Sequence, residues 1–68
     1  MKLEGDEVGV RALKALAAQD KNQIRFLIQE AKTNTDRRTR FRGLDGTSWI
    51  LRIDVMTGDL VIEPVASG

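Results

Sequence analysis

The spacing of apolar residues changes once along the chain, and this change constrains the fold more than any other feature. Up to about residue 33 the apolar residues recur at the interval of a helix surface, and from about residue 37 they alternate with polar residues. A helical half followed by a run of strands is typical of the α+β class. We therefore predict two N-terminal helices packed on one face of a three-stranded antiparallel meander, in the order ααβββ.

Asp20 separates two apolar stripes in the helical half. The first helix begins between residues 6 and 10, and its stripe consists of Val8, Val10, Leu13, Leu16 and Ala17. The second stripe follows an i, i+3, i+4, i+7 spacing and consists of Ile24, Leu27, Ile28 and Ala31. Asp20 is a favourable N-cap for the second helix, and the turn-forming residues 33–35 end it. One long kinked helix is the alternative, but it would bury the Asp20 carboxylate without a partner.

The alternating half predicts three strands, at residues 37–42, 48–54 and 59–63. A three-residue first loop, with Gly46 in the left-handed conformation, pairs Phe41 with Trp49 and directs the arginines to the opposite face. A two-residue turn would instead bury three arginines among apolar side chains, which is too costly. A four-residue second loop continues the apolar face onto the third strand, with the pairs Ile53–Leu60 and Leu51–Ile62.

The sharpest feature of the sequence is a basic segment between residues 32 and 42. Five of the 11 Lys and Arg residues lie there, opposed only by Asp36, whereas the rest of the chain is net acidic. Three arginines of this segment share the exposed sheet face with an arginine of the next strand. With Lys32, the candidate anion-binding residues are therefore Arg38, Arg40, Arg42 and Arg52. Because the planar guanidinium suits phosphate, we expect this face to bind DNA or RNA.

Several other interpretations of the basic residues remain open. Charged side chains on an edge strand prevent sheets from aggregating, and Glu63 and Asp36 are able to pair with the arginines. An acidic protein or a small anionic ligand would use the same face. A helix-turn-helix around Asp20 is a further alternative, with base contacts from Lys21, Asn22, Arg25 and Gln29.

Phe26 lies off the apolar stripe of its helix. It either packs against the first helix through Leu13 or Leu16, or it anchors a partner, since aromatic residues are favoured at interface centres. Ile50 and Val61 face outward on the sheet and form a small apolar centre with an arginine rim. The alternative function is therefore a protein-interaction module or a homodimeric accessory subunit that uses these three residues.

Composition excludes several classes of chemistry. The 68 residues contain no His, Cys or Tyr, which removes the neutral-pH proton shuttle, the thiol nucleophile and the soft metal ligands. We expect a non-enzymatic protein without a metal or cofactor. It forms one small domain, 1–68, with residues 1–6 and 65–68 expected to be flexible. A domain of this size is marginally stable alone, which favours a ligand or a second copy of the chain.

Membrane and secretory signals are weak in this sequence. No apolar run approaches the length of a membrane helix, and the acidic first residues lack the apolar core of a secretory signal. The absence of cysteine fits a reducing compartment. We therefore expect a cytoplasmic protein without a membrane partner.

Overall fold

A computed structural model describes residues 2–65 of the chain. The elements, in chain order, are β1 (Leu3–Gly5), α1 (Glu7–Gln19), α2 (Lys21–Thr33), β2 (Arg38–Arg42), β3 (Ser48–Ile53) and β4 (Leu60–Pro64). Of the C-terminal segment expected to be flexible, residues 66–68 lie outside the described part.

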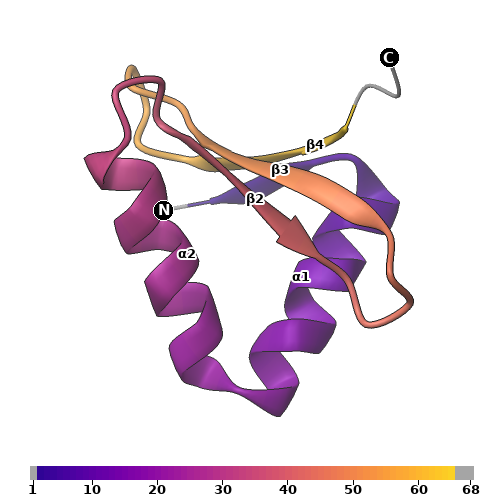
Figure 1. Ribbon diagram of the computed structural model, residues 1–68. Coiled ribbons are helices and arrows are strands. Elements are labelled where there is room, and N and C mark those ends of the chain that lie inside the picture. The colour runs from indigo at the N-terminus through magenta and orange to yellow at the C-terminus, as the bar shows by residue number, and fades with distance from the viewer. Residues whose placement is uncertain (1, 66–68) are drawn as a thin grey trace.

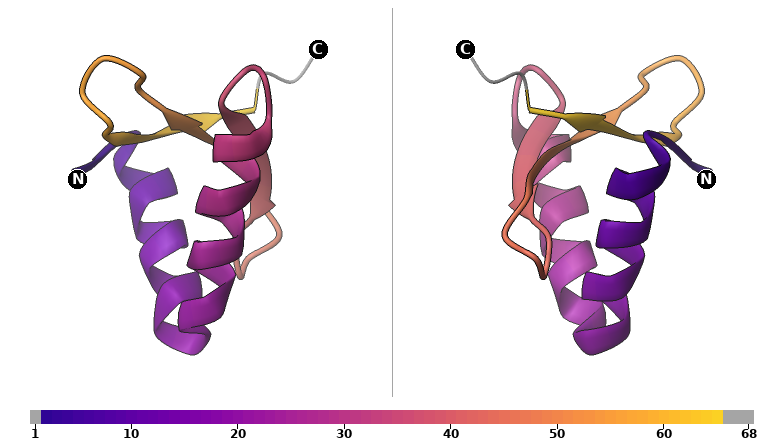
Figure 2. Two further views of the ribbon diagram at one scale, coloured as in Figure 1. Left: turned by 90° about the vertical axis from the view of Figure 1, so that its left-hand side faces the viewer. Right: turned by 90° about the vertical axis from the view of Figure 1, so that its right-hand side faces the viewer.

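The α+β class is confirmed, but the expectation that the sheet has only three strands, all antiparallel, is wrong. The sheet has four strands in the order β1-β4-β3-β2, and it is mixed because β1 runs parallel to β4 (Figure 1). Strands β2, β3 and β4 form the expected antiparallel meander. Both helices lie on one side of the sheet, and no described element covers its other face (Figure 2). This uncovered surface is called the outer face below.

The fourth strand comes from the N-terminal segment that was expected to be flexible. The N–H of Leu60 donates to the carbonyl of Lys2 at 2.8 Å, and the N–H of Asp6 donates to the carbonyl of Ile62 at 2.9 Å. A strand of three residues is too short to show alternation, and its partner β4 lies at the far end of the chain. Consequently β4 is an internal strand, and the two edges of the sheet are β1 and β2.

Asp20 ends α1 and begins α2, which confirms two helices rather than one. Its N–H donates to the carbonyl of Leu16 at 2.9 Å, and its Oδ1 accepts from the N–H of Asn22 at 3.0 Å. The connection between the helices is this single residue, shorter than the three- or four-residue turn of a helix-turn-helix motif. The geometry therefore gives no support to the helix-turn-helix alternative.

The predicted register of both hairpins is confirmed. Phe41 pairs with Trp49, and Gly46 adopts a φ of +86° in the loop between β2 and β3. In the second hairpin, Ile53 pairs with Leu60. Two short loops thus place the apolar side chains of three strands on the same face.

The hydrophobic core lies between this inner face and the helices. Its buried members are Leu13, Leu16, Phe41, Trp49, Leu51, Leu60 and Ile62. Helix α2 contributes less to it than its apolar stripe suggested, because only Ala31 is fully buried. The other stripe residues of this helix, Ile24, Leu27 and Ile28, pack against the core but remain partly exposed. Val8 of α1, expected to lead into the first stripe, is 58% exposed.

Gly9 marks the closest approach of α1 to the sheet. A Cβ at this position would lie 2.6 Å from Cγ2 of Ile62 and 2.7 Å from Cε3 of Trp49, which is closer than real contacts allow. A glycine near the start of a helix lowers helix propensity. The structure shows what the glycine provides, since it lets α1 pack directly on two core side chains.

We predict that Gly9→Ala destabilises the protein by about 1–3 kcal/mol, because overpacking of the core outweighs the gain of about 1 kcal/mol in helix propensity. Urea unfolding followed by the fluorescence of Trp49 measures the change. Ala18→Gly, at an exposed position of the same helix, is the control and is expected to show the propensity effect alone. A more stable Gly9→Ala variant would contradict the close packing of α1.

Candidate nucleic-acid interface

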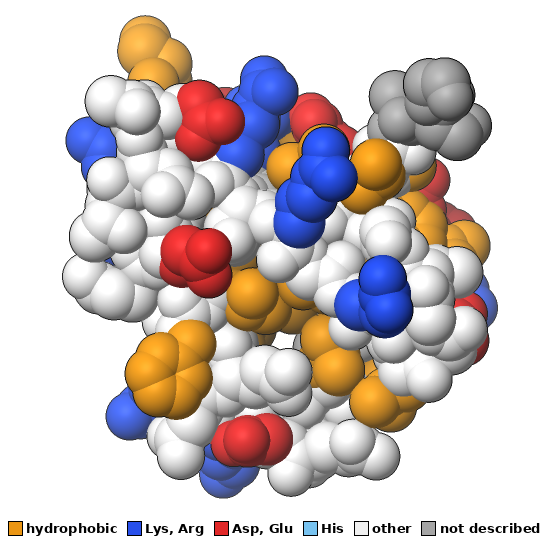
Figure 3. Space-filling view, in the orientation of Figure 1, with side chains coloured by type: hydrophobic (Ala, Val, Ile, Leu, Met, Phe, Trp, Pro, Cys, Tyr) orange, Lys and Arg blue, Asp and Glu red, His pale blue; other side chains and the backbone are white. Residues whose placement is uncertain are grey.

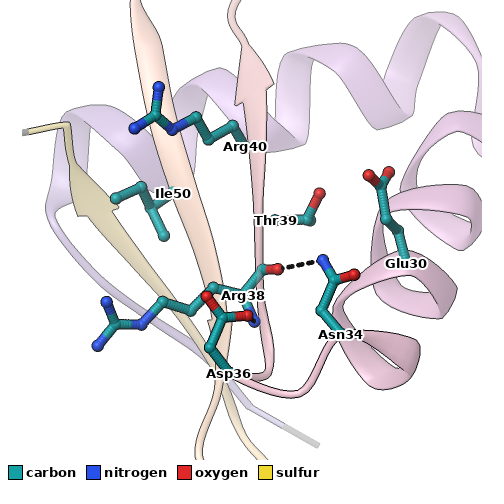
Figure 4. Close-up of a pocket in the computed structure, with 7 residues that line it drawn as sticks. All are labelled: Glu30, Asn34, Asp36, Arg38, Thr39, Arg40 and Ile50. Atoms are coloured by element: carbon teal, nitrogen blue, oxygen red, sulfur yellow. Dashed lines mark hydrogen bonds between the residues drawn. The ribbon is translucent and has the colours of Figure 1, made fainter.

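Three arginines lie on the outer face of β2. The burial of Thr39 and Phe41 on the inner side directs Arg38, Arg40 and Arg42 outward, and all three are exposed. Figure 4 shows Arg38 and Arg40 on the side of the strand opposite Thr39, flanking Ile50 of β3. Alternate residues of a strand are about 6.8 Å apart, so the three guanidinium groups form a row along the edge of the sheet.

Arg52 joins the same face, but its charge is partly neutralised. It lies opposite Arg38 in the register, as predicted. Its Nε donates to Oε1 of Glu63 at 3.1 Å, and both side chains are partly exposed. Among residues 2–65 this is the only salt bridge between side chains. The interpretation that a carboxylate pairs with the arginines therefore holds for Arg52.

Asp36 does not neutralise a guanidinium. Its Oδ1 accepts from the backbone N–H of Arg38 at 3.2 Å, while Nδ2 of Asn34 donates to the carbonyl of Arg38 at 2.6 Å (Figure 4). The two side chains thus fix the start of β2. In the part of the chain that the structure describes, no carboxylate lies within salt-bridge distance of Arg38, Arg40 or Arg42.

The remaining basic residues of the segment lie elsewhere. Lys32 is in the last turn of α2, on the helix side of the sheet, so the structure does not bring it together with the outer-face arginines. Arg37 has a left-handed backbone with a φ of +57°, and its Nη1 donates to the carbonyl of Lys32. This side chain caps the C-terminal end of α2, a role that the sequence did not reveal.

The outer face is polarised from one edge to the other. Glu4 of β1 pairs with Val61 and therefore shares the outer face with Glu63 of β4. The arginines lie at the opposite edge, where basic side chains follow β2 across the surface (Figure 3). A ligand that carries negative charge would thus be directed to β2 rather than to the centre of the sheet.

The apolar residues proposed as partner contacts lie on two separate surfaces. Ile50 and Val61 are on the outer face and are partly buried by their neighbours. Phe26 is on α2 and is 73% exposed, so the expectation that it packs against Leu13 or Leu16 is wrong. Its side chain projects away from the core because the apolar stripe of α2 faces the sheet.

The loop after β2 carries a chain of hydrogen bonds that begins in the core. Nε1 of Trp49 donates to Oγ1 of Thr47 at 2.8 Å, and this hydroxyl donates to Oδ1 of Asp45 at 2.6 Å. The Thr47 hydroxyl, followed by its backbone N–H, stabilises the charged carboxylate and lowers the pKa of Asp45. These hydrogen bonds order the loop between β2 and β3, which lies beside Arg42.

The described residues contain neither a membrane-spanning helix nor a metal-binding cluster. Within residues 2–65, neither helix has the length and apolar character that crossing a bilayer would require. In the same part of the chain, no three carboxylates converge in a way that could hold a metal ion.

Comparisons of the chain with protein-family models, curated proteins and solved structures found no match.

We predict that Thr47→Val raises the pKa of Asp45 toward its ordinary value and destabilises the fold by about 1 kcal/mol, because Nε1 of Trp49 loses its acceptor. NMR titration of the Asp45 carboxyl and urea unfolding measure the two effects. Since the pKa is depressed in the folded state, the Asp45 contribution is present above the ordinary pKa and is lost as pH falls through the depressed value. Thr47→Ser retains the hydroxyl and is expected to keep the low pKa.

Proposed function

We propose that this protein is a non-enzymatic binding module that binds nucleic acid through its phosphates. Arg38, Arg40 and Arg42 are the principal contacts. The observation that supports the proposal most strongly is their alignment at three successive outward positions of an edge strand, without a carboxylate partner among the described residues. Arg52 supplements them once Glu63 releases it.

Repulsion between the arginines supports an anionic ligand. Arg38 faces Arg52 across the strand pair, and like charges placed directly opposite destabilise a sheet. The Glu63 carboxylate offsets only one of these two charges. A phosphate backbone relieves this repulsion and gains charge-assisted, bidentate hydrogen bonds. Binding releases counterions from the nucleic acid, which contributes most of the free energy of non-specific binding.

The absence of aromatic side chains among the arginines favours backbone contacts over base stacking. Trp49 and Phe41 are buried on the inner face, whereas proteins that bind single strands without sequence preference stack bases on exposed aromatic rings. We therefore propose weak sequence preference and strong dependence on salt.

We predict that the double variant Arg40→Ala/Arg42→Ala binds mixed-sequence oligonucleotides more weakly and with a flatter salt dependence. Each phosphate contact contributes about 0.9 to the slope of log affinity against log salt for duplex DNA, so the slope should fall by about 2. Fluorescence anisotropy at several salt concentrations, with labelled DNA and RNA, measures both quantities.

Two matched variants complete this test. Arg11→Ala/Lys14→Ala likewise removes two positive charges, but from α1 on the opposite side of the sheet, and should change affinity little. Glu63→Gln removes a negative charge from the outer face and frees Arg52, so it should raise affinity by about two- to fivefold. Absence of binding by the wild-type protein at low salt, or equal losses for all the arginine variants, would contradict the proposal.

A second candidate function is association with another protein, or with a second copy, through Phe26. The observation that favours it is the 73% exposure of this aromatic side chain on α2. We predict that Phe26→Ser reduces any self-association of the wild-type protein, because it removes the apolar anchor from the interface. Size-exclusion chromatography with light scattering at several concentrations measures the mass. A dimer that persists in Phe26→Ser would exclude this residue as the contact.

A further inference from the structure

The free edge of β2 exposes backbone groups as well as arginine side chains. In the ladder with β3, the N–H of Gly43 donates to the carbonyl of Thr47 at 2.8 Å, and the N–H of Ile53 donates to the carbonyl of Arg37 at 2.9 Å. Hydrogen-bonded pairs alternate along an antiparallel ladder, so the even-numbered residues of β2 form the non-hydrogen-bonded pairs. Their N–H and C=O groups therefore point away from β3, toward the free edge.

Along the free edge of β2, the backbone groups of the first residue are hydrogen-bonded, and those of the later residues are available to a partner. The N–H and C=O of Arg38 are satisfied by the side chains of Asp36 and Asn34. Among residues 2–65, no strand pairs with β2 on the side away from β3, so the backbone groups of Arg40 and Arg42 have no partner there. Such an edge is a template for a further strand.

A hollow of about 420 Å³ lies beside the open edge. Arg38, Thr39 and Arg40 of β2 line it from the sheet together with Ile50 of β3 (Figure 4). Glu30 of α2 lines its other side, and Asn34 and Asp36 line it from the connection between α2 and β2. The lining is therefore mostly polar, and a strand added here would direct alternate side chains toward the arginines and into this hollow.

We propose that the edge of β2 binds an extended acidic segment of a protein partner by strand addition. The segment alternates carboxylate residues, which pair with Arg40 and Arg42, with uncharged polar residues, which enter the mostly polar hollow. Backbone hydrogen bonds to these two arginines provide the affinity, as in other modes of β-augmentation. The proposal adds a second ligand to the proposed function, and the two ligands compete because they share guanidinium groups.

The charge of β2 favours an acidic segment over a second copy of the chain as the strand that pairs with its edge. Antiparallel pairing of β2 with β2 of another copy would place arginines opposite arginines on the outer face, which is unfavourable. A strand that carries carboxylates at alternate positions turns each of these contacts into an attraction. The edge therefore selects an acidic partner strand.

Two substitutions of Arg40 distinguish the contribution of its backbone N–H to binding from that of its charge. Arg40→Pro removes the N–H that points to the free edge and leaves the ladder with β3 intact, while Arg40→Gln removes the same charge and keeps the N–H. The probe is a capped, fluorescently labelled peptide of alternating Glu and Thr, titrated at low salt. We expect Arg40→Gln to weaken peptide binding about threefold and Arg40→Pro to weaken it about tenfold or more.

The same two variants distinguish this proposal from nucleic-acid binding. The phosphate contacts proposed above use only arginine side chains, so the two variants should lose equal affinity for an oligonucleotide, whatever the peptide result. Equal losses for the peptide would overturn strand addition in favour of charge attraction alone. A wild-type dimer that Arg40→Pro dissolves would overturn it in favour of a second copy.

A change in the peptide provides an independent test if Arg40→Pro is unfolded by circular dichroism. N-methylation of the probe at alternate residues removes the N–H groups of one edge and leaves every carboxylate in place. Strand addition predicts that wild-type protein binds one of the two methylation patterns at least about tenfold more weakly than the other. Equal binding of both patterns would refute strand addition.

Discussion

The pairing of Phe41 with Trp49 determines where every charge on β2 lies. Because side chains alternate along a strand, burial of Phe41 on the inner face requires the arginines on either side of it to point into solvent. A shift of one residue would exchange the two sets, and the three-residue loop with Gly46 at positive φ prevents that shift. The core thereby positions the basic surface without any direct contact between them.

The helical hairpin, the α+β class and the register of both β-hairpins could be predicted from the sequence, because each depends on local signals. Asp20 marked the boundary between the helices, and the apolar pattern excluded the register that buries arginine. Strand β1 was missed because a strand of three residues with a single apolar side chain, Leu3, shows no alternation of apolar and polar residues. Its pairing is with β4, and nothing near Leu3 in the sequence indicates that partner.

The candidate site was predicted in outline, and its individual charges were not. The register placed four arginines on one face, but only coordinates could show that Arg52 is paired with Glu63 while the three on β2 lack carboxylate partners among the described residues. Arg37 belongs to the same basic segment, but its left-handed backbone turns its side chain onto the end of α2. Charge counts along a sequence cannot distinguish a helix cap from a ligand contact.

Strand β1 connects segments that are distant along the chain. The N–H of Lys2 donates to Oδ1 of Asp59 across a separation of 57 residues, whereas the helical hairpin and both β-hairpins close locally. Contacts of such high contact order incur the entropy of a long loop before they contribute stability. We therefore expect β1 to dock late in folding and to be released early in unfolding. Release of β1 leaves β4 as an unprotected sheet edge. The acidic side of the molecule is therefore also the side on which unfolding is expected to begin.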